Sequence, residues 1–173
     1  EDMGIWREEV LARWRKFIDA AAGSGVTLLH ENEKDIYGDT PERCLDLAKT
    51  LGIPLIFDPA NFVQCGAETY PYAYNLLKEH IVYMHIKDCL ADTGKVVPSG
   101  YGDGHIGEII SELDKTGYEG FLSLEPHLGH FEGFSDLEPN SPINNLPAGG
   151  PKSYRMAAVS LFKVLDSLGL DYE

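Results

Sequence analysis

Basic residues are scarce in this chain. Its 173 residues include 14 lysines and arginines against 28 aspartates and glutamates, so the formal net charge is −14 at pH 7. Such a charge repels the phosphate backbone of nucleic acids and the surface of anionic membranes. The sequence also has no apolar run of membrane-spanning length and no recognisable signal peptide. We therefore expect neither nucleic acid nor a membrane as partner.

Cysteine is also sparse. The three cysteines, Cys44, Cys65 and Cys89, are odd in number and do not have the spacing of a zinc site. This pattern favours a reducing compartment, and we expect the protein to be cytoplasmic.

Apolar residues make up 43% of the chain, which is typical of a globular domain with one core. Their periodicity predicts short strands that alternate with amphipathic helices. We expect helices at about residues 4–22, 41–51, 70–80, 106–115 and 152–168, and strands at 26–30, 54–58, 81–85 and 121–125. Strands that alternate with helices indicate an α/β fold whose parallel sheet is covered by helices. Residues 59–69, 86–105 and 126–150 are expected to be loops.

Each predicted strand ends at a residue that can bind a metal ion: Glu31, Asp58, His85 and Glu125. In parallel α/β sheets the carboxyl ends of the strands meet at one edge, where functional groups collect. Three carboxylates and one histidine at that edge need a divalent cation to offset their repulsion. A single strand-end carboxylate often only caps the next helix, but four such residues in successive units predict a metal site. Oxygen-rich ligation without thiolate suits Mn²⁺ or Mg²⁺, and Co²⁺, Fe²⁺ and Zn²⁺ stay open.

Five segments resemble the xylose isomerase-like TIM-barrel superfamily, especially its sugar phosphate isomerase/epimerase branch. They are residues 28–33, 57–62, 84–88, 100–107 and 120–127. The resemblance implies a TIM (β/α)8 barrel and one divalent metal ion, commonly manganese. It assigns Glu31, Asp58, His85 and Glu125 as the metal ligands. It also implies that the metal-bound Glu31 and Glu125 are the catalytic acid and base.

The function implied by this resemblance is a sugar or sugar-phosphate isomerase or epimerase of carbohydrate metabolism. A metal ion that binds a sugar carbonyl and its neighbouring hydroxyl acidifies the adjacent C–H, and a glutamate can remove that proton to give an ene-diolate. Return of the proton to the same carbon inverts it, return to the neighbouring carbon interconverts aldose and ketose, and loss of water makes a dehydratase. The four residues alone do not separate these reactions. A non-catalytic metal- or sugar-binding module is the alternative from a different class.

Five further residues are candidates for binding the substrate: Asn61, Lys87, Asp88, Lys95 and His127. Lys87 and Asp88 follow His85 at the proposed mouth, and a lysine can bind a hydroxyl or phosphate oxygen. His127 lies in residues 126–150, which we interpret as a lid because they directly follow Glu125. Solvated loop charge and a flexible surface excursion are the alternatives for Lys95 and for the long loop.

Related endonucleases that cut abasic DNA carry a histidine three residues after the metal-binding aspartate, where this chain has Asn61. Residues 95–99 also lack the Asp-x-His pair of those enzymes. Both differences remove ligands for additional metal ions. An endonuclease is therefore disfavoured, and because many epimerases contact the substrate with a histidine at this position, the identity of the substrate stays open.

A TIM barrel has eight strands and typically about 250 residues, whereas the sequence predicts four strands. We therefore expect residues 1–173 to be a single domain, the C-terminal half of a barrel. Because four parallel strands leave open edges that favour association, we expect a homodimer or the missing N-terminal half as partner. The chain starts with Glu1 and not methionine, which agrees with a processed chain or a piece of a longer one.

Overall fold

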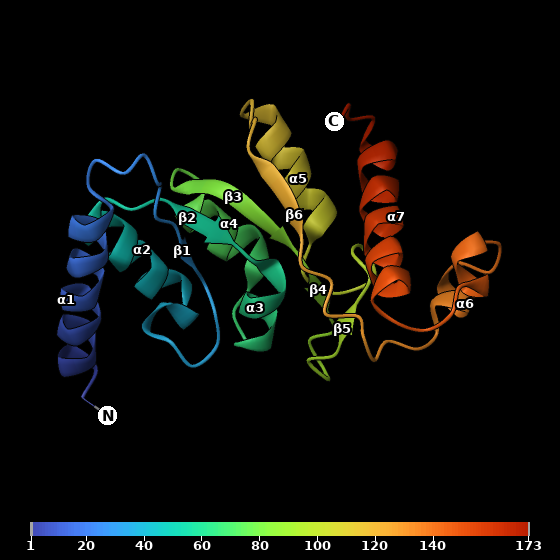
Figure 1. The fold of residues 1–173 in the computed structure, drawn as a ribbon, viewed down its shortest axis with the longest axis horizontal. Coiled ribbons are helices and arrows are strands. Elements are labelled where there is room, and N and C mark those ends of the chain that lie inside the picture. The colour runs from blue at the N-terminus through green and yellow to red at the C-terminus, as the bar shows by residue number, and fades with distance from the viewer. Residues whose placement is uncertain (1, 173) are drawn as a thin grey trace.

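A four-stranded parallel sheet forms the centre of the computed structural model, which describes residues 2–172 (Figure 1). The strands stand in the order β1-β2-β3-β6, and all three neighbouring pairs are parallel. Their bounds are β1 (His30–Glu31), β2 (Leu55–Phe57), β3 (Ile81–Ile86) and β6 (Phe121–Leu124). The predicted α/β fold with a parallel sheet is confirmed.

Helices connect these strands and cover one face of the sheet. They are α1 (Met3–Ala21), α2 (Pro41–Leu51), α3 (Pro59–Gln64), α4 (Tyr74–Leu77), α5 (Ile106–Lys115), α6 (Phe134–Leu137) and α7 (Gly150–Leu168). The largest core cluster joins side chains of β2 and β3 with side chains of α2, α3, α4, α5 and α7. None of the helices within residues 2–172 is long and apolar enough to cross a membrane.

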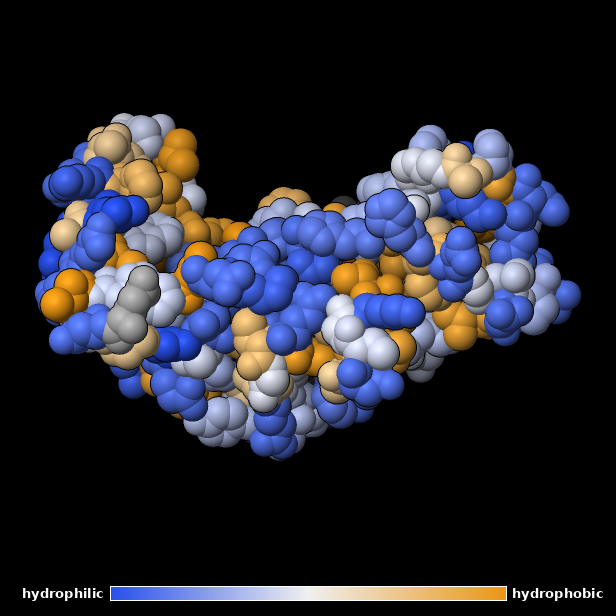
Figure 2. All heavy atoms as spheres, turned by 90° about the horizontal axis from the view of Figure 1, so that it is seen from below, coloured by the Kyte–Doolittle hydropathy of each residue, from blue (hydrophilic) through white to orange (hydrophobic). Residues whose placement is uncertain are grey.

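The opposite face of the sheet is open. In β3 the side chains of Met84 and Ile86 lie in the core, so the alternation of a strand turns Tyr83 and His85 to the other face. Tyr83 packs there against Phe121 of β6, which is 72% exposed. Figure 2 shows the chain as a curved body that is hollowed between its two ends. A closed barrel would bury this face.

Two predicted elements differ from the structure between β2 and β3. The expected loop at residues 59–69 begins with α3, because Asp58 accepts a hydrogen bond from the backbone N–H of Asn61 (3.0 Å) and Pro59 occupies the first helical position. The expected helix at residues 70–80 is divided into a π-helical turn (Thr69–Ala73) and α4. The backbone of Tyr70 is extended, as is common for a residue that precedes proline.

The glycine-rich loop after β3 is organised around one buried carboxylate. Strands β4 (Asp88–Cys89) and β5 (Val96–Val97) form a short antiparallel pair, which the prediction of a plain loop missed. Asp88 is 1% exposed and accepts backbone N–H bonds of 2.9–3.0 Å from Cys89, Gly100, Gly102 and Gly104. A Cβ at Gly102 would lie 2.4 Å from Asp88 Oδ1, so only glycine permits this close approach.

Residues 126–150 pack against α7. Leu128, Phe134 and Ile143 are buried in a second core cluster together with Met156 and Ala157 of α7. The segment contains α6 and a 3-10 turn (Pro142–Asn145). Its interpretation as a lid stays a prediction.

We expect Asp88→Asn to destabilise the chain by about 2 to 3 kcal/mol, because it replaces an acceptor of four N–H bonds with a partly donating amide. Urea unfolding of the metal-free chain measures the loss. The matched control is Asp92→Asn, at an exposed position of the same loop. Equal unfolding midpoints for the two variants would contradict the structural role of Asp88.

Candidate metal centre

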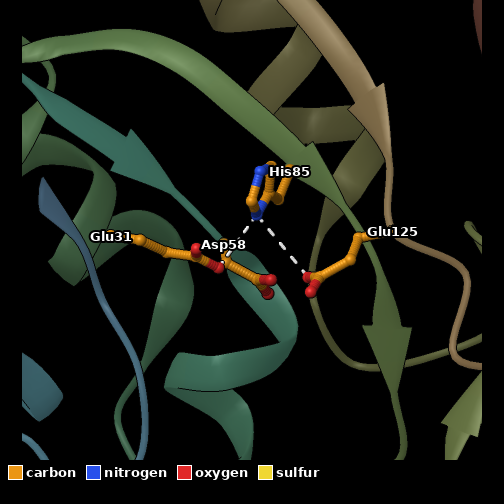
Figure 3. A group of neighbouring side chains, drawn as sticks. All are labelled: Glu31, Asp58, His85 and Glu125. Carbon is orange, nitrogen blue, oxygen red and sulfur yellow. Dashed lines mark hydrogen bonds and ion pairs between the residues drawn. The ribbon is translucent and has the colours of Figure 1, made fainter. Parts of the chain in front are cut away.

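Four side chains from four strands meet at the carboxyl edge of the sheet. Glu31 ends β1, His85 lies near the end of β3, and Asp58 and Glu125 directly follow β2 and β6. One potential ligand atom of each residue lies within 4.8 Å of those of the other three. Figure 3 shows the four side chains pointing toward one another. The predicted ligands are therefore brought together.

Strand alternation explains why these side chains share the open face. His30, the neighbour of Glu31, points the opposite way and packs against Trp14, with its Nε2 3.9 Å from Cys44 Sγ. Burial lowers the pKa of His30 to about 4, so this histidine is neutral at pH 7. It is part of the core and not a fifth ligand.

His85 stands between the two glutamates. Its Nδ1 lies 2.9 Å from Glu31 Oε1 and 3.5 Å from Glu125 Oε2, the two contacts drawn as dashed lines in Figure 3. The hydrogen bond to Glu31 raises the pKa of His85 above its ordinary value, although burial opposes this shift. The negative charge of the two glutamates thus favours the protonated form of His85.

Lys87 lies inside the centre. Its Nζ is 2.8 Å from Asp58 Oδ2 and 2.7 Å from Glu125 Oε2, and its side chain is 1% exposed. Burial alone would lower the pKa of Lys87, but the two carboxylates outweigh burial and raise it. Burial alone would raise the pKa of Glu125, but Lys87 outweighs burial and holds the pKa of that carboxyl below its usual range. The sequence places Lys87 at the mouth as a substrate contact, whereas the structure places it between two of the predicted ligands.

Asp58 offers the clearest test of whether a metal ion fits. Its side chain is fully buried, and burial raises its pKa to about 7 despite the nearby Lys87. Its Oδ1 caps the following helix, and its Oδ2 pairs with the Lys87 ammonium at 2.8 Å. A buried carboxylate is costly unless positive charge accompanies it, and one ammonium does not offset the three carboxylates of the centre. The donor set of three carboxylates and one imidazole fits a divalent ion.

Asn61 lies buried beside the proposed ligands and does not face solvent. Its side chain is fully buried, and its Nδ2 donates to Asn32 O (2.9 Å) and weakly to Glu31 Oε1 (3.4 Å). Its Oδ1 accepts a hydrogen bond from Lys34 Nζ (2.9 Å). Asn32 in turn exchanges two hydrogen bonds with the backbone of Asp58 (2.8 and 2.9 Å). Lys34 was not among the site residues predicted from the sequence. The only feature of the sequence that indicates its role is its position in the loop after Glu31.

The other candidate substrate residues divide into two groups. The Asp88 carboxylate is occupied by backbone N–H groups and does not reach the centre. His127 does reach it, because its Nε2 lies 3.3 Å from Glu125 Oε1 while its side chain is 59% exposed. Lys95 and His127 line one open pocket of about 430 Å³. The rest of the lining is Leu90, Val96, Val97, His130, Phe131 and Glu132.

The sequence matches the family model "Xylose isomerase-like TIM barrel" over residues 5–143. The chain belongs to the xylose isomerase-like TIM-barrel family. This confirms the resemblance that the five sequence segments indicated. No curated protein matches the chain significantly.

Solved structures of this kind share the fold at low sequence identity. A xylose isomerase domain protein from Planctomyces limnophilus has a TM-score of 0.65 at 18% identity, with 94% of this chain and 53% of that one covered. A D-tagatose 3-epimerase-like protein has a TM-score of 0.67 at 15% identity, with 94% and 55% covered. The probable 3-DHS dehydratase AsbF from Bacillus anthracis, involved in petrobactin synthesis, has a TM-score of 0.64 at 21% identity, with 92% and 56% covered.

The chain therefore spans about half the length of these solved structures. Together with the four-stranded sheet, this confirms that the described fold is a partial TIM barrel.

We expect the affinity for Mn²⁺ to fall as the pH is lowered from 8 to 6. Because the pKa values of Asp58 and His85 both lie above their ordinary values, protons compete with the metal ion for these groups in this range. Each proton released weakens binding by up to about tenfold per pH unit. Calorimetric titrations in buffers of different ionisation enthalpy measure both the affinity and the protons released.

The His105→Ala variant is the control for this titration, since His105 pairs with Glu108 and is not one of the four ligands. It should keep the pH dependence of the unmodified chain. Mn²⁺ binding that releases no protons and is constant over this pH range would contradict the ligand assignment.

Proposed function

We propose that this chain carries the metal ligands and the acid and base of a sugar or sugar-phosphate isomerase or epimerase. The observation that carries this proposal is the placement of Glu31 and Glu125 on two sides of His85, at 2.9 and 3.5 Å from its Nδ1. The side chains of these glutamates are 27% and 31% exposed, whereas that of Asp58 is fully buried. Glu31 and Glu125 can therefore meet a substrate, and Asp58 is suited only to hold an ion.

The two glutamates divide the proton transfers between them. Lys87 holds the pKa of the Glu125 carboxyl below its usual range, which favours its ionised form, and we assign Glu125 as the group that takes the proton from carbon. Glu31 would return the proton from the other side of the substrate. A divalent ion held by Glu31, Asp58, His85 and Glu125, with Mn²⁺ as our first choice, would supply Lewis-acid polarisation of the sugar carbonyl.

The pocket lined by Lys95 and His127 lies beside Glu125, because His127 lines the pocket and its Nε2 also lies 3.3 Å from Glu125 Oε1. We assign it to the part of the substrate that does not react. An ammonium group and imidazoles can bind sugar hydroxyls or a phosphate. Asn61, Lys87 and Asp88 are engaged by protein groups, so we assign them to support the centre and the loop.

A dehydratase is the second candidate, and the similarity to the probable 3-DHS dehydratase of Bacillus anthracis favours it specifically. Removal of the same proton followed by loss of water uses the same base. A non-catalytic metal- or sugar-binding module is a further alternative, because the hollowed face lacks the wall that a closed barrel would supply. The abasic-site endonuclease stays disfavoured, since the net charge of −14 opposes nucleic acid binding.

A second copy of the chain, or the N-terminal half of a barrel, would cover the open face. A cytoplasmic location agrees with the free thiols of Cys44, Cys65 and Cys89.

The test is solvent deuterium exchange into ketoses, aldoses and their phosphates with Mn²⁺ present, followed by mass spectrometry. Glu125→Gln and Glu31→Gln should each slow exchange by about 10²-fold or more, because each removes one proton-transfer group. The control is Glu119→Gln, at an exposed position away from the centre. Release of water from the substrate would identify a dehydratase.

Exchange that survives in both glutamine variants would contradict the acid and base assignment. A chain that binds Mn²⁺ but exchanges no deuterium into any of these sugars would favour the binding module.

A further inference from the structure

Lys87 is the one lysine or arginine side chain buried within residues 2–172. Burying a lysine is costly, and the cost is offset only where the ammonium has close partners of opposite charge. Here Nζ has two such partners, Asp58 Oδ2 at 2.8 Å and Glu125 Oε2 at 2.7 Å. Both partners are also metal ligands in the proposed function, so the ammonium and the ion share the same two carboxylates.

The charges of the centre can be counted from these residues. Glu31, Asp58 and Glu125 contribute three negative charges, Lys87 contributes one positive charge, and a histidine that binds a metal ion is neutral. The centre therefore has a charge of −2, which equals that of one divalent cation in magnitude. Without the ammonium the same ligands would have a charge of −3.

The ammonium is held in place. Its side chain is 1% exposed, and its Nζ lies 2.8 and 2.7 Å from the two carboxylates. Its charge therefore lies within contact distance of two of the proposed ligands. At the same distance, a fixed positive charge repels a trivalent ion about 1.5 times as strongly as a divalent ion, because the Coulomb energy is proportional to the charge of the ion.

We propose that Lys87 determines the valence of the ion that this centre accepts, favouring divalent over trivalent cations. This inference rests on the proposed metal site and adds a residue that selects the ion without binding it.

The experiment measures the ratio of Tb³⁺ affinity to Mn²⁺ affinity across variants that change the charge of the centre. Glu125→Gln changes the charge to −1, the unmodified chain has −2, and Lys87→Met changes it to −3. Tb³⁺ is followed by luminescence sensitised through Tyr83, whose ring lies 5.8 Å from that of His85. Mn²⁺ is followed by electron paramagnetic resonance in competition with Tb³⁺.

We expect the ratio to rise with each step of this series, and by at least about tenfold from the unmodified chain to Lys87→Met. Lys87→Arg keeps the charge and should keep the ratio. Lys115→Met removes an exposed lysine outside the centre and should also leave the ratio unchanged.

Equal changes in the two affinities, with a constant ratio, would overturn the proposal, because a merely structural lysine affects both ions alike. If Lys87→Met does not fold, Lys87→Gln removes the same charge with a polar side chain, and a ratio equal to that of the unmodified chain overturns the proposal as well. Failure of the unmodified chain to bind either ion would instead refute the metal site itself, and with it both proposals.

Discussion

Mutual repulsion of three carboxylates is the constraint on which the rest of this structure depends. Glu31, Asp58 and Glu125 come from three different strands, and a parallel sheet necessarily brings the ends of these strands to one edge. Their proximity is costly unless positive charge accompanies it. The chain provides part of that charge through Lys87, whose Nζ contacts two of the carboxylates. The remaining negative charge suits the centre to hold a cation.

The surroundings of the centre keep the carboxylates in place. Asn32 and Asn61 fix the turn after β2, and Asp58 caps the helix that follows it with one oxygen while its other oxygen pairs with Lys87. Beyond the end of β3, Asp88 holds the glycine-rich loop through backbone hydrogen bonds from Gly100, Gly102 and Gly104. The two buried aspartates thus have different surroundings. Backbone N–H groups surround Asp88, whereas Asp58 faces the Lys87 ammonium and the other proposed ligands.

The sequence was sufficient to predict four parallel strands and the four residues that meet at their carboxyl edge, because strand periodicity and chain position determine them, although β1 (His30–Glu31) begins later than the strand expected at 26–30. The helix after Asp58 was missed, since its six residues carry too little apolar periodicity to be recognised. The burial of Lys87 was also missed, although the signal was present: Lys87 follows His85 by two residues, and alternation places both on one face. Three of the four bonds to Asp88 depend on a loop that returns 12 to 16 residues later, which no local pattern reveals.

We propose that Glu31, Asp58, His85 and Glu125 hold one divalent ion. Elemental analysis of the folded chain after dialysis against Mn²⁺ tests it most directly, with the His85→Ala variant measured in parallel and folding checked by circular dichroism. We predict about one manganese per chain in the unmodified protein and a large loss of bound manganese in the variant. A folded chain that retains no manganese, or a variant that retains as much as the unmodified chain, would contradict it.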